Sequence, residues 1–318
     1  MLCAWVGASW ATRSAAPEYF AGSDYTAPVA DLPERLSTRD ALQLHLQHWP
    51  AAGRAAGSVL IVHGLGEHIG RYRHVAAQLN AWGWQAFGYD QRGHGGSGGP
   101  RGGLAADDDL LHDLAAVIDA VRAALAPNGG PLVLLGHSMG GLVAARFAAG
   151  EAGAAWLRPV EALVLSSPAL DPGMSMAQKL LLASLGRLAP NLALGNGLKP
   201  EWISRDAQVV RDYTADSSVH DRITPRLARF IVDGGAVVAA RAGGWRVPTL
   251  LMYAGSDRCV APAGSAGFAA AAPQALVAVH EFRRLYHEIF NEPEQAEVFG
   301  VLQDWLAALE LPAPQSAP

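Results

Sequence analysis

The sequence is poor in charge and in cysteine. Charged residues make up 17% of its 318 positions, against about 25% in typical soluble proteins, and the formal net charge is only −5. This weak negative charge excludes the basic surface that nucleic-acid binding requires. Half of the residues are hydrophobic, so the chain can bury a large core, which excludes intrinsic disorder for most of its length.

Two cysteines, Cys3 and Cys259, match no zinc-ligand or CxxC spacing, and we expect both to be free thiols. The longest uncharged stretch, residues 260–279, is long enough to span a bilayer, but we expect four residues to break it as a helix. These residues are Pro262, Gly264, Gly267 and Pro273. No basic residue precedes Arg13, so a secretory signal is not predicted and a cytoplasmic protein is expected.

Short apolar runs alternate with longer amphipathic segments from residue 58 onward, which is typical of a parallel sheet with crossover helices. The predicted strands are 58–62, 84–89, 131–135, 162–165, 248–253 and 275–279. The predicted helices, covering both faces, are 72–82, 105–125, 140–149 and 294–309. Leucines alternate with polar residues over 42–47 after a polar turn, which predicts an antiparallel hairpin. We therefore expect a doubly wound, mostly parallel sheet with an antiparallel N-terminal edge.

One long stretch, from residue 167 to about residue 246, departs from this alternation and contains no convincing strand. It includes a Leu- and Met-rich segment at 174–188, a polar segment at 202–221 and a helical period over 224–241. Prolines and glycines mark both of its ends. The pattern predicts a helical insertion into the α/β core.

A candidate nucleophile follows the predicted strand at 131–135. Gly136, Ser138 and Gly140 have the G-x-S-x-G spacing of a nucleophile elbow, in which a sharp strand-to-helix turn lifts the serine hydroxyl above the sheet. Taken alone, the pentapeptide is also compatible with a plain glycine-rich turn. The strand before it and the small-residue helix start after it favour the nucleophile.

A serine nucleophile needs a base and a carboxylate that orients the base. Asp257 follows the predicted strand 248–253, and His287 follows the next predicted strand, so both are expected at the carboxyl ends of strands, where open α/β sheets bind ligands. The chain order Ser, Asp, His is that of α/β hydrolases. Histidines in glycine-flanked turns, in a strand or beside the nucleophile fit the role of base less well.

Two backbone N–H groups are expected to hold the oxyanion of a tetrahedral intermediate. Met139 directly follows the nucleophile, and Leu65 lies in the glycine-rich loop after the first long strand. The alternative for that loop is a glycine turn without a catalytic role.

Three motifs extend the similarity beyond the elbow. Residues 63–72 read HGLGEHIGRY, residues 90–97 read DQRGHGGS and residues 136–141 read GHSMGG. Over residues 36–309 the sequence resembles the monoacylglycerol lipase and lysophospholipase group of α/β hydrolases. The resemblance implies an α/β-hydrolase core at 28–168 and 247–311, a helical cap at 169–246, an N-terminal extension at 1–27 and a tail at 312–318.

The resemblance also implies a cofactor-free serine hydrolase that releases a fatty acid from a single-acyl lipid, monoacylglycerol-like or lysophospholipid-like. It places Glu67, Arg71 and His137 near the alcohol end of the substrate, although Glu67 and Arg71 are four residues apart and could simply pair with each other. Met174 and Leu181 are candidates for an acyl-chain tunnel, with ordinary packing as the alternative.

Three other readings stay open at the level of sequence. The same site suits a short-chain carboxylesterase or a serine aminopeptidase, and the fold also serves as a non-catalytic ligand pocket. An apolar cap rim could contact a membrane surface transiently, peripheral to the bilayer. The sequence does not indicate an oligomeric state.

Overall fold

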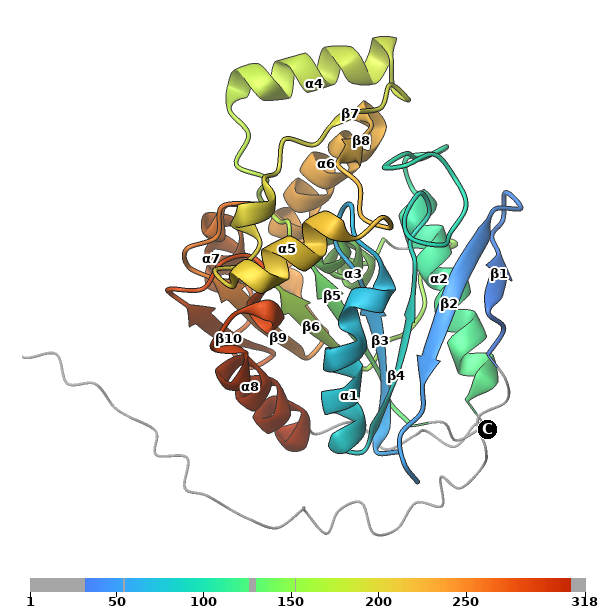
Figure 1. The fold of residues 1–318 in the computed structure, drawn as a ribbon, viewed down its shortest axis with the longest axis vertical. Helices are drawn as coiled ribbons and strands as arrows, with labels where there is room; N and C mark the ends of the chain where they lie inside the picture. Colours follow the sequence, from blue (N-terminus) through green and yellow to red (C-terminus); the bar gives the residue numbers. More distant parts are fainter. Residues whose placement is uncertain (1–31, 54, 126–129, 152, 310–318) are drawn as a thin grey trace, which may run out of the picture.

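An eight-stranded sheet runs through the part of the chain that the computed structural model describes, residues 32–53, 55–125, 130–151 and 153–309 (Figure 1). Its order is β1-β2-β4-β3-β5-β6-β9-β10. The strands are β1 (Arg35–Ser37), β2 (Gln43–Trp49), β3 (Gly57–Val62), β4 (Trp84–Tyr89), β5 (Leu132–His137), β6 (Ala162–Ser166), β9 (Thr249–Ala254) and β10 (Val277–Phe282). β2 pairs antiparallel with β1 and β4, and the other neighbours are parallel. The predicted mostly parallel sheet with an antiparallel N-terminal edge is confirmed.

Helices cover both faces of the sheet and bury two apolar layers. One layer contains α1 (Arg73–Ala81) and α8 (Gln295–Ala308); the other contains α2 (Asp109–Ala124), α3 (Met139–Ala149), α6 (Pro225–Arg241) and α7 (Pro262–Ala271). Along β5, Leu132 and Leu134 belong to the second layer, whereas Val133 and Leu135 belong to the first. Because a central parallel strand is apolar on both faces, its sequence reads as a continuous hydrophobic run.

Helix α7 occupies only residues 262–271 of the uncharged stretch 260–279. The breaks predicted at Pro262 and Pro273 are confirmed, whereas those predicted at Gly264 and Gly267 are wrong, because both glycines lie inside the helix. Pro262 is its first residue, where the missing N–H has no acceptor to lose. Gly264 and Gly267 each cost about 1 kcal/mol relative to alanine, which tertiary packing outweighs. Pro273 lies beyond the end of the helix. Within the described residues, no helix is both long enough and apolar enough to cross a membrane.

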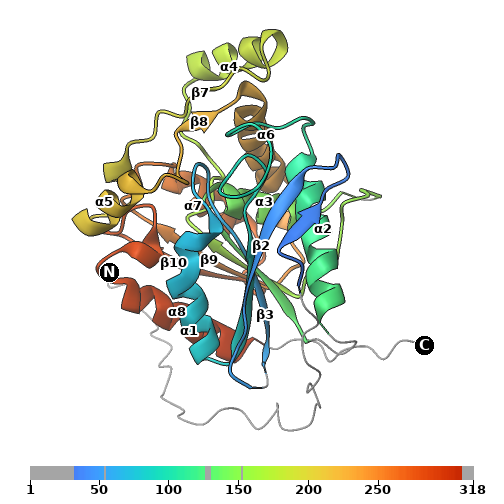
Figure 2. The ribbon, with the colours of Figure 1, turned by 45° about the vertical axis from the view of Figure 1, so that its right-hand side comes forward.

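Between β6 and β9 lies the segment that we call the β6–β9 insertion, residues 167–248. It contains α4 (Met176–Leu188), β7 (Leu194–Gly195), a 3-10 turn η3 (Pro200–Trp202), α5 (Ala207–Ala215), β8 (Arg222–Ile223), α6 and a 3-10 turn η4 (Ala242–Gly244). β7 and β8 form a two-stranded ladder, which the sequence did not predict because two residues are too few for a pattern. α6 packs against α3 and helps to cover the sheet, whereas α4 projects at one end of the molecule (Figures 1 and 2).

The predicted N-terminal extension (1–27), the tail (312–318) and Cys3 lie outside the described residues. Cys259 is described and is a free thiol.

Candidate active site

Ser138 occupies a strained turn between β5 and α3. Its backbone has φ 53° and ψ −121°, a conformation that L-residues rarely adopt. A side chain at Gly140 would approach the Val62 carbonyl oxygen to 2.1 Å, and one at Gly136 would approach the Gly140 oxygen to 2.5 Å. Glycine is therefore required on both sides of the serine, which is the physical reason for the G-x-S-x-G spacing.

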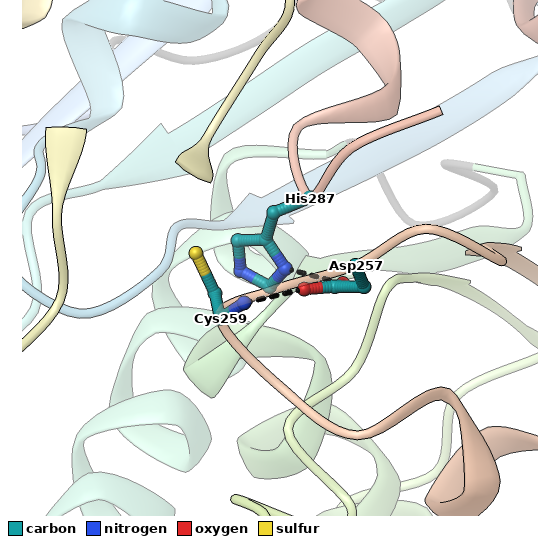
Figure 3. Close-up of side chains that lie close together, drawn as sticks. All are labelled: Asp257, Cys259 and His287. Carbon is teal, nitrogen blue, oxygen red and sulfur yellow. Dashed lines mark hydrogen bonds and ion pairs between the residues drawn. The ribbon is translucent and has the colours of Figure 1, made fainter. Parts of the chain in front are cut away.

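The structure brings Ser138, His287 and Asp257 into one hydrogen-bonded chain. The Ser138 hydroxyl lies 2.8 Å from His287 Nε2. His287 Nδ1 lies 2.7 Å from Asp257 Oδ2 (Figure 3). These partners fit a neutral imidazole that carries its proton on Nδ1 and accepts a hydrogen bond at Nε2. Ser138 follows β5, Asp257 follows β9 and His287 follows β10. The three residues therefore meet at the carboxyl edge of the sheet.

The acid and the base of this chain stabilise each other's charged forms. Burial opposes ionisation of Asp257, but the charge of His287, its hydrogen bond, and backbone N–H bonds from Cys259 and Val260 hold the Asp257 pKa below its usual value. Burial also opposes protonation of His287, yet the Asp257 carboxylate outweighs it and raises the His287 pKa. The raised pKa makes the His287 imidazole a stronger base.

Candidate oxyanion donors lie on both sides of the serine. Met139 is the first residue of α3, so its N–H has no acceptor within the helix. Leu65 belongs to the loop after β3, which lies against Ser138: a side chain at Gly64 would sit 3.1 Å from Ser138 Cβ. Leu65 and Ser138 line the same cavity.

That cavity has a volume of about 430 Å³ and is more polar than the sequence suggested. Of the predicted site residues, it is lined by Leu65, Glu67, His137, Ser138 and His287. The structure does not bring the other substrate-binding candidates to it: Met174, Leu181 and Arg71 are not among its lining residues, and Leu181 is 59% exposed. An apolar run predicts a hydrophobic surface but not the direction in which that surface points.

Glu67 and Arg71 pair with each other, as the alternative reading of the sequence allowed. Arg71 Nη1 lies 2.6 Å from Glu67 Oε2, and the same guanidinium makes two hydrogen bonds to Glu288, of 2.6 and 2.7 Å. Burial opposes ionisation of Glu67, but the charge of Arg71 outweighs it and lowers the Glu67 pKa. Glu288 was not among the predicted site residues, and its only signal in the sequence was an acidic residue next to the predicted base.

His137 is buried beside the base, with its ring centroid 4.7 Å from that of His287. Burial and the charge of His287 lower its pKa to about 4, so His137 is neutral at physiological pH. Its Nδ1 lies 3.1 Å from the Ser166 carbonyl oxygen, to which it donates. His137 therefore shapes the wall of the cavity as a neutral ring.

Cys259 lies next to the acid and the base (Figure 3). Possible metal-ligating atoms of Asp257, Cys259 and His287 lie within 4.8 Å of one another. Asp257 and His287 already hydrogen-bond to each other, which accounts for their closeness without an ion. Burial, followed by the charges of Asp257 and Glu288, raises the pKa of the Cys259 thiol.

Comparison with known proteins identifies one family and several relatives. The Hydrolase_4 family model, described as serine aminopeptidase S33, matches residues 53–294. Monoacylglycerol lipase of Mycolicibacterium smegmatis is 34% identical over 82% of this chain and 91% of its own length. Phospholipase YtpA of Bacillus subtilis is 31% identical over 78% of this chain and 94% of its own length.

Solved structures agree with the sequence comparisons. The crystal structure of the monoacylglycerol lipase of Paleococcus ferrophilus has a TM-score of 0.74 and 32% identity, covering 83% of this chain and 98% of its own. A soluble variant of the monoglyceride lipase of Saccharomyces cerevisiae, in complex with a substrate analogue, has a TM-score of 0.77 and 22% identity, over 90% of this chain and 97% of its own. At that identity, the second likeness supports the fold alone.

Proposed function

This chain belongs to the Hydrolase_4 family of α/β hydrolases and is a carboxylic-ester hydrolase, and on that premise we propose that it releases a fatty acid from a single-acyl lipid through Ser138, His287 and Asp257. The family membership agrees with the resemblance and the α/β-hydrolase fold expected from the sequence. The observation that carries the proposal is the hydrogen-bonded chain from Ser138 through His287 to Asp257, at the wall of a cavity.

In this mechanism, Ser138 Oγ attacks the ester carbonyl carbon while His287 Nε2 accepts the hydroxyl proton. Asp257 orients the imidazole and stabilises the imidazolium that forms. The backbone N–H groups of Leu65 and Met139 donate to the oxyanion. His287 then protonates the leaving alcohol, and water hydrolyses the acyl-enzyme with His287 again as base.

The charges around the cavity favour a neutral head group over a phosphate. Four carboxylates are among the lining residues, Glu67, Asp216, Asp221 and Glu288, together with a single lysine, Lys199. Arg71 pairs with Glu67 and Glu288 but does not line the cavity. Carboxylates repel a phosphodiester but accept hydrogen bonds from hydroxyl groups. We therefore propose a monoacylglycerol-like substrate ahead of a lysophospholipid. Similarity to proteins named monoacylglycerol lipase supports this choice.

We further propose that residues 169–246 act as a cap over the site and that α4 contacts the lipid surface. Four large apolar side chains of α4 are strongly exposed: Met176 (71%), Leu180 (64%), Leu181 (59%) and Leu188 (85%). An exposed apolar patch of this kind is typical of a membrane or partner surface. Surface contact replaces the acyl-tunnel role expected for Leu181.

The test is turnover of wild-type and Ser138→Ala protein on monoacylglycerols, lysophosphatidylcholine, short p-nitrophenyl esters and aminoacyl anilides. We expect preference for long-chain monoacylglycerol and loss of all turnover in the alanine variant. Activity confined to the anilides would instead support the aminopeptidase that the family description names. Wild-type protein that fails to react with a fluorophosphonate would contradict a serine hydrolase altogether.

A further inference from the structure

The guanidinium of Arg71 lies where three separate segments of the chain meet. It pairs with Glu67 of the loop after β3 and with Glu288 of the loop after β10. It also lies 4.7 Å from the ring centroid of Tyr213, on α5 of the β6–β9 insertion. The side chains of Arg71, Glu67 and Glu288 are only 12%, 4% and 6% exposed.

Each of the two carboxylates is connected to a proposed catalytic group, Glu67 through a hydrogen bond and Glu288 through its place in the chain. Glu67 Oε1 accepts a hydrogen bond of 2.5 Å from the Gly64 N–H, next to the proposed oxyanion donor Leu65. Glu288 directly follows His287 in the chain, and its Oε2, which accepts from Arg71 Nη2, also accepts from Asn291 Nδ2 at 2.8 Å. One cation therefore joins the loop of the oxyanion hole to the loop of the base.

A contribution to stability alone is a poor explanation for these two ion pairs of Arg71. A buried ion pair gains little net free energy, because desolvation of the charges offsets their attraction. A planar guanidinium that holds two carboxylates at once does fix geometry, and lysine cannot reproduce this bidentate contact. Arg71 is also not among the residues that line the cavity, which argues against contact with the substrate.

We infer that Arg71 is a positioning residue, which holds the Leu65 N–H and the His287 imidazole in register with Ser138. The inference rests on the proposed triad and oxyanion hole. It concerns a step common to all esters, the attack of Ser138 Oγ on the carbonyl. Loss of the Arg71 guanidinium should therefore slow the hydrolysis of every ester by a similar factor, whatever the alcohol.

Arg71→Lys tests this with two substrates, a long-chain monoacylglycerol and p-nitrophenyl acetate, which has no glycerol. Rates are expressed per active site, counted by burst titration. We expect kcat to fall about 10- to 100-fold on both substrates, with KM changed less than about threefold, because small misplacements of catalytic groups are costly. Arg122→Met is the matched control: it breaks an ion pair with Glu161 at the opposite end of β5 and should leave both rates unchanged.

A second variant tests the inference without leaving a buried charge that could prevent folding. Arg71→Met alone leaves two buried carboxylates unpaired, so we combine it with Glu67→Gln and Glu288→Gln, which removes all three charges and keeps the side-chain lengths at positions 67 and 288. This neutral variant should also turn over both substrates slowly.

Two results would overturn the inference. A lower melting temperature with wild-type turnover per active site would leave Arg71 a purely structural role. A loss confined to monoacylglycerol would make Arg71 a head-group contact. Failure of the proposed function is recognised separately, because Ser138→Ala would then keep wild-type turnover.

Discussion

The backbone N–H of His220 donates a hydrogen bond of 2.8 Å to the carbonyl oxygen of Gly66, which joins the β6–β9 insertion to the loop after β3. His68 of the same loop pairs with Asp216 of the insertion at 2.8 Å. On the other side of the site, the Glu288 N–H donates to the Ile203 carbonyl. The insertion is therefore hydrogen-bonded to both loops that border Ser138.

Gly66→Ala should disturb the first of these contacts. Gly66 has φ +79°, and a side chain there would approach the His220 oxygen to 2.3 Å. We expect a loss of about 2–4 kcal/mol in the free energy of unfolding, from backbone strain and overpacking together, with reduced turnover. Gly83→Ala is the control, because Gly83 has φ +81° but nothing within 4 Å, and it should cost only about 1 kcal/mol. If urea unfolding shows the same loss in the free energy of unfolding for both variants, the prediction is contradicted.

The pH dependence of kcat/KM should follow the protonation of His287. The Asp257 charge raises the His287 pKa despite burial, so the imidazole stays protonated to a higher pH and cannot accept the serine proton there. Activity should therefore fall as pH drops through a value above about 6.5, the usual histidine pKa. Asp257→Asn should move this acid limb to lower pH and lower kcat about 10⁴-fold. An acid limb that does not move would exclude His287 as the titrating base.

Cys259 offers a probe of the cavity. Burial raises the pKa of its thiol, so the reactive thiolate is scarce near neutral pH and labelling by a maleimide should be slow and faster at alkaline pH. Once attached, a bulky adduct in the cavity should slow turnover. The experiment uses a Cys3→Ser background, with the double Cys3→Ser, Cys259→Ser protein as the unlabelled control. Full activity after mass spectrometry verifies labelling would refute the prediction.

Binding of α4 to a lipid surface can be measured by flotation with phosphatidylcholine vesicles. Leu180→Ser combined with Leu181→Ser removes two exposed apolar side chains, each able to gain about 1.5 kcal/mol or more when buried. We expect at least about tenfold weaker binding than wild type. Ala177→Ser, at an exposed position of the same helix, should bind like wild type. The idea fails if wild-type protein does not float, or if both variants float equally.

Most of the sheet could be predicted because its central strands are buried on both faces. Residues 84–89 were predicted as a strand and form β4, in which every residue is buried. The last strand was predicted at 275–279 but is β10, residues Val277–Phe282. Four of its six residues are exposed at the sheet edge, so hydrophobicity gives little signal there.

The proposed triad could be chosen from the sequence because chain order and position after strands constrain it. The residues that surround the triad could not be predicted from the sequence. The contact between Arg71 and Glu288 joins residues 217 positions apart, and no local pattern reports such a pair. For α4, the Leu- and Met-rich composition of residues 174–188 indicated an apolar surface, but whether Leu181 met the cavity or solvent depended on how the helix docks.

The position of His287 after β10 has a consequence during synthesis of the chain. Ser138 leaves the ribosome 149 residues before His287, which is contributed by the loop after the edge strand. Until β10 pairs with β9, the elbow can form with its serine hydroxyl unactivated. If the proposed triad acts, the nascent protein therefore acquires its hydrolytic chemistry only when its last strand docks.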